Sequence, residues 1–329
     1  MSVYGDITPR TAAYAVDKML ERAQPQLNMA RFAVVTTVPK GKTKVVKWRR
    51  YGRLSPSATP LSEGVTPTAG NITSTDVTAT LDQYGQRVQM TDVIADTHED
   101  PVLTEFAMSL GETAGQTQEL IIYNAIKAGT SVTYANGTTR VGITAVLSAA
   151  VARKSIRSLK QQDARPLTTM LNATDGVGTV PIPPCFVCFV HPNVEMDLQN
   201  TTNFPSGYTR VQAYGTFKPL SDAEIGSFEN IRFMASTLYT PFANAGGTLG
   251  TNLGGTATDV YASIVVGKDA YATVNLAGSG NGLTPIVVNP KPSDSDPMGQ
   301  RGHVAFKMYS VAAILNDAWM NRIEHAVSA

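Results

Sequence analysis

The arrangement of the chain is decided by one stretch, Asp100–Gly129, with the sequence DPVLTEFAMSLGETAGQTQELIIYNAIKAG. Asp100 is a favourable N-cap, Pro101 suits the first helical turn, and Gly129 suits the position just past a helix end. Small and apolar residues recur between them at helical spacing: Leu103, Ala107, Leu110, Ala114, Ile121 and Ala125. The pattern predicts one helix of about 28 residues, roughly 42 Å long at 1.5 Å per residue. A helix of this length can serve as a spine for the other elements.

The segment before this helix, residues 40–90, has the pattern of a long two-stranded hairpin. Lys42–Tyr51 is rich in β-branched and basic residues, and Asp76–Leu81 alternates apolar and polar residues as a half-exposed strand does. Between them, Leu54–Gly70 is rich in Ser, Pro, Thr and Gly and is too polar to bury itself. Because a two-stranded hairpin has no core of its own, we expect it to find its packing partner elsewhere.

The chain begins with a predicted arm, residues 1–39. It contains an amphipathic stretch, Thr11–Ala23, that stops before Pro25. A helix of about a dozen residues is marginal alone. We therefore expect it to dock on the body or on a neighbouring subunit.

Beyond the long helix the pattern becomes mixed α/β. Helices are predicted over Thr144–Lys160 and Asn193–Gln199, and a C-terminal helix is predicted from the spacing of Ala312, Leu315, Trp319 and Ile323. Strands are predicted over Cys185–Val190, Ile231–Ala235, Tyr261–Gly267 and Val304–Met308. The Gly- and Thr-rich segment 244–258 is interpreted as an inserted loop.

The composition is unusually poor in charge. Charged residues make up 16% of the 329 residues, below the typical ~25%, and the net charge is +1. A low charge fraction suggests that much of the surface contacts protein, and near-neutrality argues against a generic polyanion binder. The longest charge-free stretch, Phe233–Thr258, is too rich in Gly, Thr and Asn to span a membrane, so no membrane partner is expected.

The charges are nevertheless distributed unevenly. Residues 22–62 contain no acid, and residues 88–126 contain no base. We predict that the basic hairpin of one copy lies across the acidic helix of another, which would fix register more than affinity. The candidate interface residues are Lys44, Lys47, Arg49, Arg50, Glu99, Glu105 and Glu112. Two alternatives stay open: a solvated strand face, and nucleic-acid binding through residues 40–53 with Trp48 and Tyr51 as stacking groups.

No pattern in the sequence indicates catalysis. Gly41-Lys42-Thr43 resembles the end of a phosphate-binding loop, but the required earlier glycine is Thr36. Cys185 and Cys188 have CxxC spacing within an apolar strand, where residues three apart face opposite sides, so we expect two buried structural cysteines. We therefore expect no enzyme, catalytic residue, cofactor or metal ion.

Several short motifs from about residue 50 to the C-terminus resemble one family, the major capsid proteins of tailed bacteriophages, specifically the N4-like major capsid protein family. They are Arg50–Leu54 (RYGRL), Ala58–Pro67 (ATPLSEGVTP), Gln83–Gly85 (QYG), Thr91-Asp92, Gly267–Tyr271 (GKDAY), Gln300–His303 (QRGH), Ile314–Asp317 (ILND), Trp319 and Arg322–Glu324 (RIE). Together they are fairly specific, although no single motif is.

The resemblance implies an α+β chain with the HK97-like capsid fold. That fold has an N-terminal arm, an extended loop hairpin, a peripheral domain with a long spine helix, and an axial domain. The corresponding boundaries here are residues 1–39 for the arm and 40–90 for the hairpin. The peripheral domain would comprise 91–165 and 300–329, and the axial domain 166–299, with the inserted loop near 244–258.

The implied function is that of a major capsid protein. Copies would form hexamers and pentamers that close into an icosahedral phage head around double-stranded DNA, contacted without sequence specificity. Further partners implied by the family are portal, scaffold and decoration proteins. The protein would be located in the virion and assembled in the host cytoplasm. An alternative with the same fold is an encapsulin-like compartment shell holding protein cargo.

Overall fold

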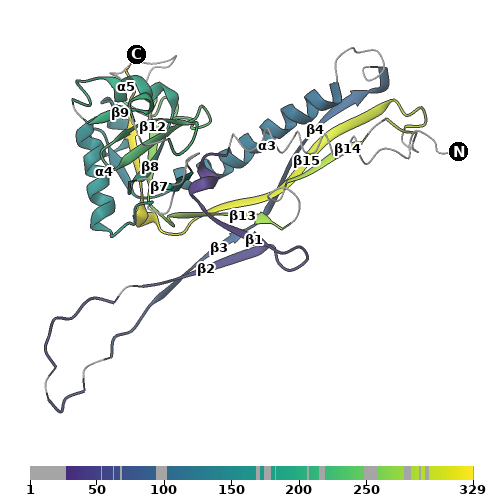
Figure 1. Ribbon diagram of the computed structural model, residues 1–329. Coiled ribbons are helices and arrows are strands. Elements are labelled where there is room, and N and C mark those ends of the chain that lie inside the picture. The colour runs from purple at the N-terminus through teal and green to yellow at the C-terminus, as the bar shows by residue number, and fades with distance from the viewer. Residues whose placement is uncertain are drawn as a thin grey trace.

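The computed structural model describes residues 27–52, 54–61, 63–66, 69–93, 102–167, 171–173, 179–181, 183–205, 207–214, 219–247, 258–277, 283–288, 290–292 and 296–328. The predicted arm helix Thr11–Ala23, most of the inserted loop 244–258, and the predicted helix-start residues Asp100 and Pro101 lie outside these ranges. The described part is mixed α and β, as predicted, and contains two large sheets connected by the long helix (Figure 1).

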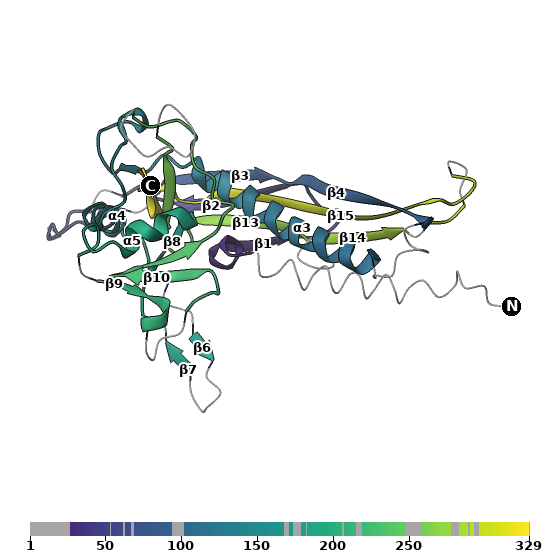
Figure 2. The same ribbon diagram turned by 90° about the horizontal axis from the view of Figure 1, so that it is seen from above.

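The long helix is α3, Val102–Lys127, close to the predicted span. It lies along a five-stranded sheet, here called the long sheet (Figure 2). The sheet follows the order β1 (Val34–Val38), β13 (Tyr271–Leu276), β15 (Arg301–Ile314) and β14 (Leu283–Val288), with β4 (Asp82–Thr91) also paired to β15. The same stretch of β15 pairs with β4 and with β14, so these two strands occupy its opposite edges.

The buried face of α3 changes along its length. Ala107, Leu110 and Ala114 pack on the long sheet, as the helical spacing predicted. Nearer the C-terminus the fully buried residues are Ile122, Tyr123 and Ile126, which pack into the second sheet. Ile121 and Ala125 are only half-buried there because the helix has passed from one core to the other.

The second large sheet has seven strands and forms, with its helices, what we call the body. The order is β5 (Val132–Tyr134), β16 (Met320–His325), β12 (Tyr261–Val266), β8 (Phe186–Val190), β11 (Ile231–Ala235), β10 (Glu224–Phe228) and β9 (Tyr208–Arg210). Helices α4 (Ala149–Gln161) and α5 (Glu195–Gln199) cover one face. The end of α3 and the 3-10 turn η3 (Met29–Phe32) cover the other.

Most of the predicted elements in the body are confirmed. Strands β8, β11 and β12 match the predicted ones, and the short helix appears as η5 (Pro192–Val194) followed by α5. The helix predicted from Thr144 begins only at Ala149, because residues before it are extended and Val146 bridges Ala326. The remaining short elements are η4 (Arg140–Gly142), η6 (Val211–Ala213), η8 (Asp317–Trp319) and a two-stranded ribbon of β6 (Leu171–Ala173) and β7 (Thr179–Pro181).

The predicted C-terminal helix is wrong. The segment holding Ala312, Leu315, Trp319 and Ile323 instead forms the end of β15, a turn and β16. Every residue of β16 is buried, because this strand lies between β5 and β12. Four of its six residues are polar, and they are buried in an ion pair and in hydrogen bonds: Asn321, Arg322, Glu324 and His325. The strand therefore shows neither the alternating nor the continuous apolar pattern by which a strand is predicted.

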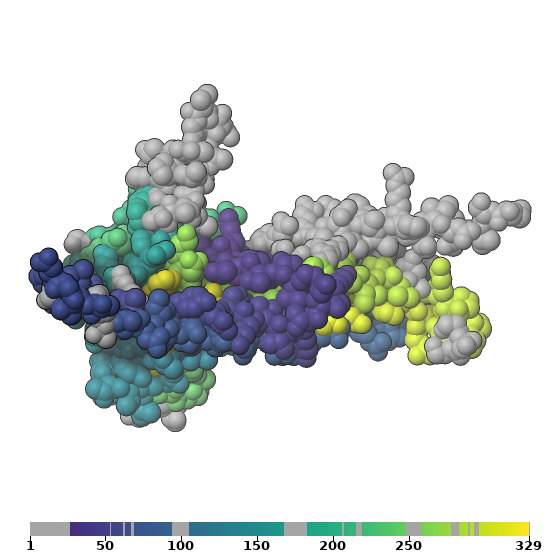
Figure 3. Space-filling model, turned by 90° about the horizontal axis from the view of Figure 1, so that it is seen from below, coloured from purple at the N-terminus to yellow at the C-terminus, as the bar shows by residue number. Residues whose placement is uncertain are grey.

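The predicted hairpin is present. Strands β2 (Val45–Tyr51) and β3 (Ser74–Thr80) pair antiparallel, with Val45 opposite Thr80 and Tyr51 opposite Ser74. The loop they carry extends away from the rest of the molecule (Figure 1). The first strands of the chain, coloured purple, cross the middle of the face shown in Figure 3.

The sheet pairings group β5, α4 and β16 with the body, and β13 and β14 with the long sheet. The domain boundaries proposed from the sequence stay a prediction. Within the described ranges no helix is both long and apolar enough to cross a bilayer.

Candidate assembly surfaces

The hairpin loop presents apolar side chains to solvent. Leu61 is 76% exposed and Val65 is 65% exposed, and Leu54 and Ile72 are also exposed. The base of the hairpin is held by a small cluster of Val38, Leu81 and Val274 with the partly buried Trp48. Beyond this base, no described residue forms a second layer over the two strands, so the outer part of the hairpin has no packing partner in the described part of the chain.

The two faces of β2 carry different chemistry because side chains alternate along a strand. Lys47 and Arg49 lie on the outer face, where both pair with Asp76 of β3, at 2.7 and 2.8 Å. These interactions, Arg49 first, lower the pKa of Asp76 to about 2. Lys44 lies 3.4 Å from Asp82. Part of the basic charge of the hairpin is therefore balanced within the same strand pair.

The acidic candidates lie elsewhere. Glu105 is exposed and Glu112 is half-buried on α3, and Glu99 lies outside the described residues. The proposed contact between these acids and the hairpin of another copy stays a prediction. Asp76 was missed in the sequence because its role depends on the register of β2 and β3, which places it opposite Arg49.

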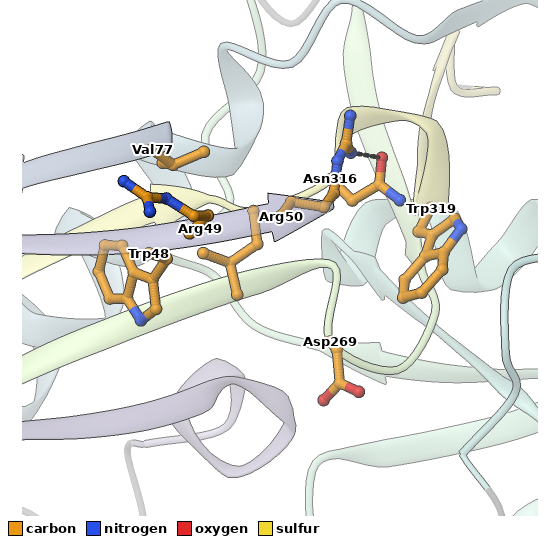
Figure 4. Close-up of a pocket in the computed structure, with 8 residues that line it drawn as sticks. Trp48, Arg49, Arg50, Val77, Asp269, Asn316 and Trp319 are labelled. Atoms are coloured by element: carbon orange, nitrogen blue, oxygen red, sulfur yellow. Dashed lines mark hydrogen bonds between the residues drawn. The ribbon is translucent and has the colours of Figure 1, made fainter. Parts of the chain in front are cut away.

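The inner face of the hairpin borders a pocket of about 240 Å³ at its base (Figure 4). Trp48 and Val77 line it from the hairpin, and Leu315 and Trp319 line it from the turn between β15 and β16. Arg50 reaches across and donates a hydrogen bond from Nη1 to Asn316 Oδ1 at 2.5 Å. Asp269 completes the lining.

The turn between β15 and β16 ties several elements together at this point. Asp317 Oδ1 accepts a hydrogen bond from the Thr130 N–H just beyond α3 at 3.0 Å. Trp319 donates from Nε1 to the carbonyl of Gln162 just beyond α4, at 3.2 Å. Gly267 fits here because an added Cβ would lie 3.1 Å from the Arg165 carbonyl and 3.3 Å from that of Trp319. Residues from the RYGRL, GKDAY and ILND motifs, which lie far apart in the sequence, thus meet at this turn, here called the junction.

A buried ion network fixes the end of the spine helix beside this junction. Glu324 accepts from Arg140 at 2.7 Å and from Arg322 at 2.8 Å. Arg322 also donates to the Gly129 carbonyl at 2.9 Å, which satisfies a carbonyl near the C-terminus of α3. The Arg140 guanidinium stacks 3.5 Å from the centre of the Phe242 ring. Gly129, predicted as a helix terminator, is also required by packing, since a Cβ would lie 2.8 Å from Met320 Cε.

A second buried acid, Glu119 of α3, holds the segment that leads in from the N-terminus. Both carboxylate oxygens accept from the Met29 N–H at 3.0 Å, and one accepts from Tyr239 Oη at 2.7 Å. Tyr271 Oη donates to the Met29 carbonyl at 2.6 Å. Burial raises the pKa of Glu119 to about 7. This role was not predicted from the sequence, because Glu119 lies in the helix whose acids were expected to contact another copy.

The junction joins a spine helix, a long sheet and an exposed hairpin to one compact body. A sequence model described as phage capsid protein matches residues 74–231, which include β3, α3 and much of the body. This part of the chain has the sequence pattern of a phage capsid protein. No curated protein sequence matches it.

Solved capsid structures share this fold over nearly the whole chain. The capsid of Ralstonia phage GP4 is 13% identical, with 92% of each chain covered and a TM-score of 0.69. The capsid of cyanophage Pam1 is 13% identical, covers 91% of this chain and 93% of its own, and has a TM-score of 0.62. A virus-like particle from Pyrococcus furiosus is 8% identical, with 94% and 98% coverage and a TM-score of 0.51. The HK97-like fold predicted from the sequence is confirmed, whereas the N4-like subfamily stays a prediction.

The matched family is one of structural proteins and not of enzymes. Cys185 and Cys188 are buried free thiols in different clusters on opposite faces of β8, as expected, and burial raises the pKa of Cys185 to about 11. Among the described residues no cluster of three His, Cys, Asp or Glu side chains could hold a metal ion.

A serine and a histidine do meet in the body. Ser263 Oγ lies 2.7 Å from His325 Nε2, and His325 Nδ1 lies 2.7 Å from the Ala326 carbonyl. Since a carbonyl only accepts, Nδ1 carries the proton and Nε2 accepts from Ser263. Both side chains are fully buried, so no substrate can reach them. Burial lowers the pKa of His325 to about 4, so the two side chains form a neutral hydrogen-bonded pair in the core of the body.

Proposed function

We propose that this capsid protein is the major shell subunit, which forms hexamers and pentamers that close into an icosahedral head around double-stranded DNA. The observation that carries the proposal is the hairpin β2–β3: its outer part is exposed, bears apolar side chains and packs on no core cluster formed by the described residues. Such an element is completed by a neighbouring copy.

In this proposal, the hairpin loop becomes ordered only when it contacts a neighbouring copy. The exposed loop between β2 and β3 loses conformational entropy when it settles on a neighbour, so each individual contact is weak. Several weak contacts made by the same subunit reinforce one another once a ring has formed. The net charge of +1 limits self-repulsion between packed copies.

The proposal also includes the other components of a phage head. Portal, scaffold and decoration proteins would contact the shell, DNA would fill it, and assembly would take place in the host cytoplasm before the protein is carried in the virion. A shell of many identical copies enclosing DNA needs a DNA entry point and a way to set its curvature, which supports a portal and a scaffold.

A second candidate is an encapsulin-like compartment shell with protein cargo. A virus-like particle from Pyrococcus furiosus shares the fold, so the fold is also compatible with a shell other than a phage head. The family match to residues 74–231 and the higher TM-scores of the phage capsids favour the phage head. The pairing of Lys47 and Arg49 with Asp76 weakens the third interpretation, nucleic-acid binding by the hairpin.

Electron microscopy and sedimentation of the full-length protein expressed alone test the proposal. Closed shells or capsomer-sized rings are expected, and the diameter of the shells would fix the copy number. Protein that stays a monodisperse monomer and never forms shells or rings would contradict it. Shells filled with protein would instead favour the compartment.

A further inference from the structure

Helix α4 presents a basic face to solvent. Its exposed side chains include Arg153, Lys154, Arg157 and Lys160, and the exposed Arg165 follows shortly after the helix. Arg153, Arg157 and Lys160 are spaced by four and three residues, so they form one stripe along the helix. The whole chain has a net charge of only +1, so this helix is much more positively charged than the chain on average.

These charges differ from those of the hairpin in their pairing. Arg153 pairs with Glu229 at 2.7 Å. Within the described ranges, no carboxylate forms an ion pair with Lys154, Arg157, Lys160 or Arg165. On the hairpin, by contrast, Lys44, Lys47 and Arg49 all have acidic partners on their own chain. The outer face of α4 therefore carries several cations that no acid of the described residues balances, whereas Lys47 and Arg49 of the hairpin share Asp76.

The basic stripe lies on a helix that is anchored in the body core, and it has no large exposed apolar side chain. The opposite face of α4 is anchored in the body core through Ala152, Ile156 and Leu159. No large apolar side chain between residues 149 and 165 is exposed. Protein interfaces rely on buried aromatic and aliphatic anchors, which this face lacks. A phosphate backbone needs only positive charge and hydrogen-bond donors, which the face supplies.

We propose that the outer face of α4, continued by Arg165, is the surface on which the shell contacts the phosphates of its packaged double-stranded DNA. The inference rests on the proposed function, a shell that encloses DNA. The stripe from Arg153 to Lys160 spans roughly 10 Å at 1.5 Å per residue, and each DNA strand presents a phosphate every ~3.4 Å of helix axis. One copy would thus follow a few phosphates and read no base, so the contact is independent of sequence.

The test measures how binding of full-length, unassembled protein to a short duplex DNA depends on salt, by fluorescence anisotropy. The double variant Arg157→Gln, Lys160→Gln removes two phosphate contacts. Each contact contributes about 0.9 to the slope of log affinity against log salt, so the slope should become shallower by about 2. The matched control is Lys291→Gln, Lys307→Gln, which removes the same charge from exposed lysines on and near the long sheet and should leave the slope unchanged.

Equal slopes for the two double variants, or no measurable binding by the wild type at low salt, would overturn the inference. The inference would also be overturned, in favour of an acidic protein partner, if poly-glutamate bound as tightly as the duplex and the α4 variant lost as much affinity for it. Shell closure is followed separately by electron microscopy. Closed shells with an unchanged slope contradict this inference alone, whereas wild-type protein that never forms shells contradicts the proposed function.

Discussion

The body and the hairpin are stabilised in opposite ways. In the body, every residue of β8, β12 and β16 is buried, and helices cover both faces of the sheet. In the hairpin, most residues of β2 and β3 are exposed, and only the base touches a core cluster. A two-stranded ribbon is marginal in water, so the hairpin is the part of the chain that requires a neighbour.

The interactions of the two regions also differ in how far solvent weakens them. The Arg140–Glu324–Arg322 network is largely enclosed, and losing one partner would leave an uncompensated buried charge. The Asp76 pairs on the hairpin are exposed and screened by salt. The body therefore defines the shape of the subunit, while the hairpin is free to adapt to its surroundings.

The largest effect is expected from removing the hairpin loop. Replacement of residues 54–70 by an Asn-Gly turn should leave the subunit folded but abolish shell closure, because the loop packs on none of the core clusters that the described residues form. Gly52 N–H already bonds the Thr73 carbonyl at 2.7 Å, so the strands can be joined there. Circular dichroism and electron microscopy give the two readouts. Normal particles from this variant would rule out the role assigned to the hairpin.

Reversing the hairpin charges should also block assembly. Lys44, Lys47 and Arg49 changed together to Glu would confront Asp76 with two new acids on its own strand pair. Two rescues separate the explanations: Asp76→Lys restores the pairing within the hairpin, and Glu105→Lys with Glu112→Lys restores pairing with another copy. The predicted contact between copies requires partial rescue by the second pair, as counted by closed particles. Rescue by Asp76→Lys alone would confine the effect to the hairpin.

Side-chain truncation should lower the free energy of unfolding much more in the body than in the hairpin loop. Phe233→Ala removes a fully buried ring from the body core and should lower the free energy of unfolding by about 3–5 kcal/mol. Leu61→Ala, at a side chain 76% exposed, should change it by less than about 0.5 kcal/mol. Urea denaturation of unassembled protein measures both. A comparable loss from the two changes would mean that the loop packs within its own subunit.

Acid should weaken the body through His325. Its folded pKa of about 4 lies below the ordinary 6.5, so the unfolded chain takes up the proton first. Stability is therefore complete above about pH 6.5 and declines as the pH falls towards 4, by up to about 3 kcal/mol. His325→Gln should remove this part of the pH dependence in denaturation curves at pH 7.5 and 4.5. The same slope in both proteins would show that His325 is not the group responsible.

Glu119 should give stability the opposite pH dependence, with its largest effect near Met29. Its folded pKa of about 7 exceeds the ordinary 4.5, so the folded chain holds the proton longer, and stability declines as the pH rises from 4.5 through 7. Glu119→Gln should flatten this decline, worth about 2 kcal/mol between pH 5 and 8. Hydrogen exchange at Met29 and its neighbours should show it first, since Met29 N–H bonds the carboxylate. An unaltered pH dependence in the variant would contradict the assignment.

The sequence predicted the parts whose pattern is local. The spine helix has a surface periodicity, and β2 and β3 alternate or are rich in β-branched residues, so each could be located from its own residues. The C-terminal strand β16 could not, because most of its buried residues are polar and leave neither an alternating nor a continuous apolar pattern. The roles of Asp76, Glu119 and Asn316 depend on partners 27, 90 and 266 residues away, and no local pattern encodes such distances.

Hydrogen–deuterium exchange of residues 52–73, compared between free subunits and closed shells, tests the difference between body and hairpin most directly. The account predicts fast exchange in the free subunit and strong protection in the shell, with β8, β12 and β16 protected equally in both. Loop amides already protected in the free subunit, or equally unprotected in both states, would contradict the claim that a neighbouring copy completes the hairpin.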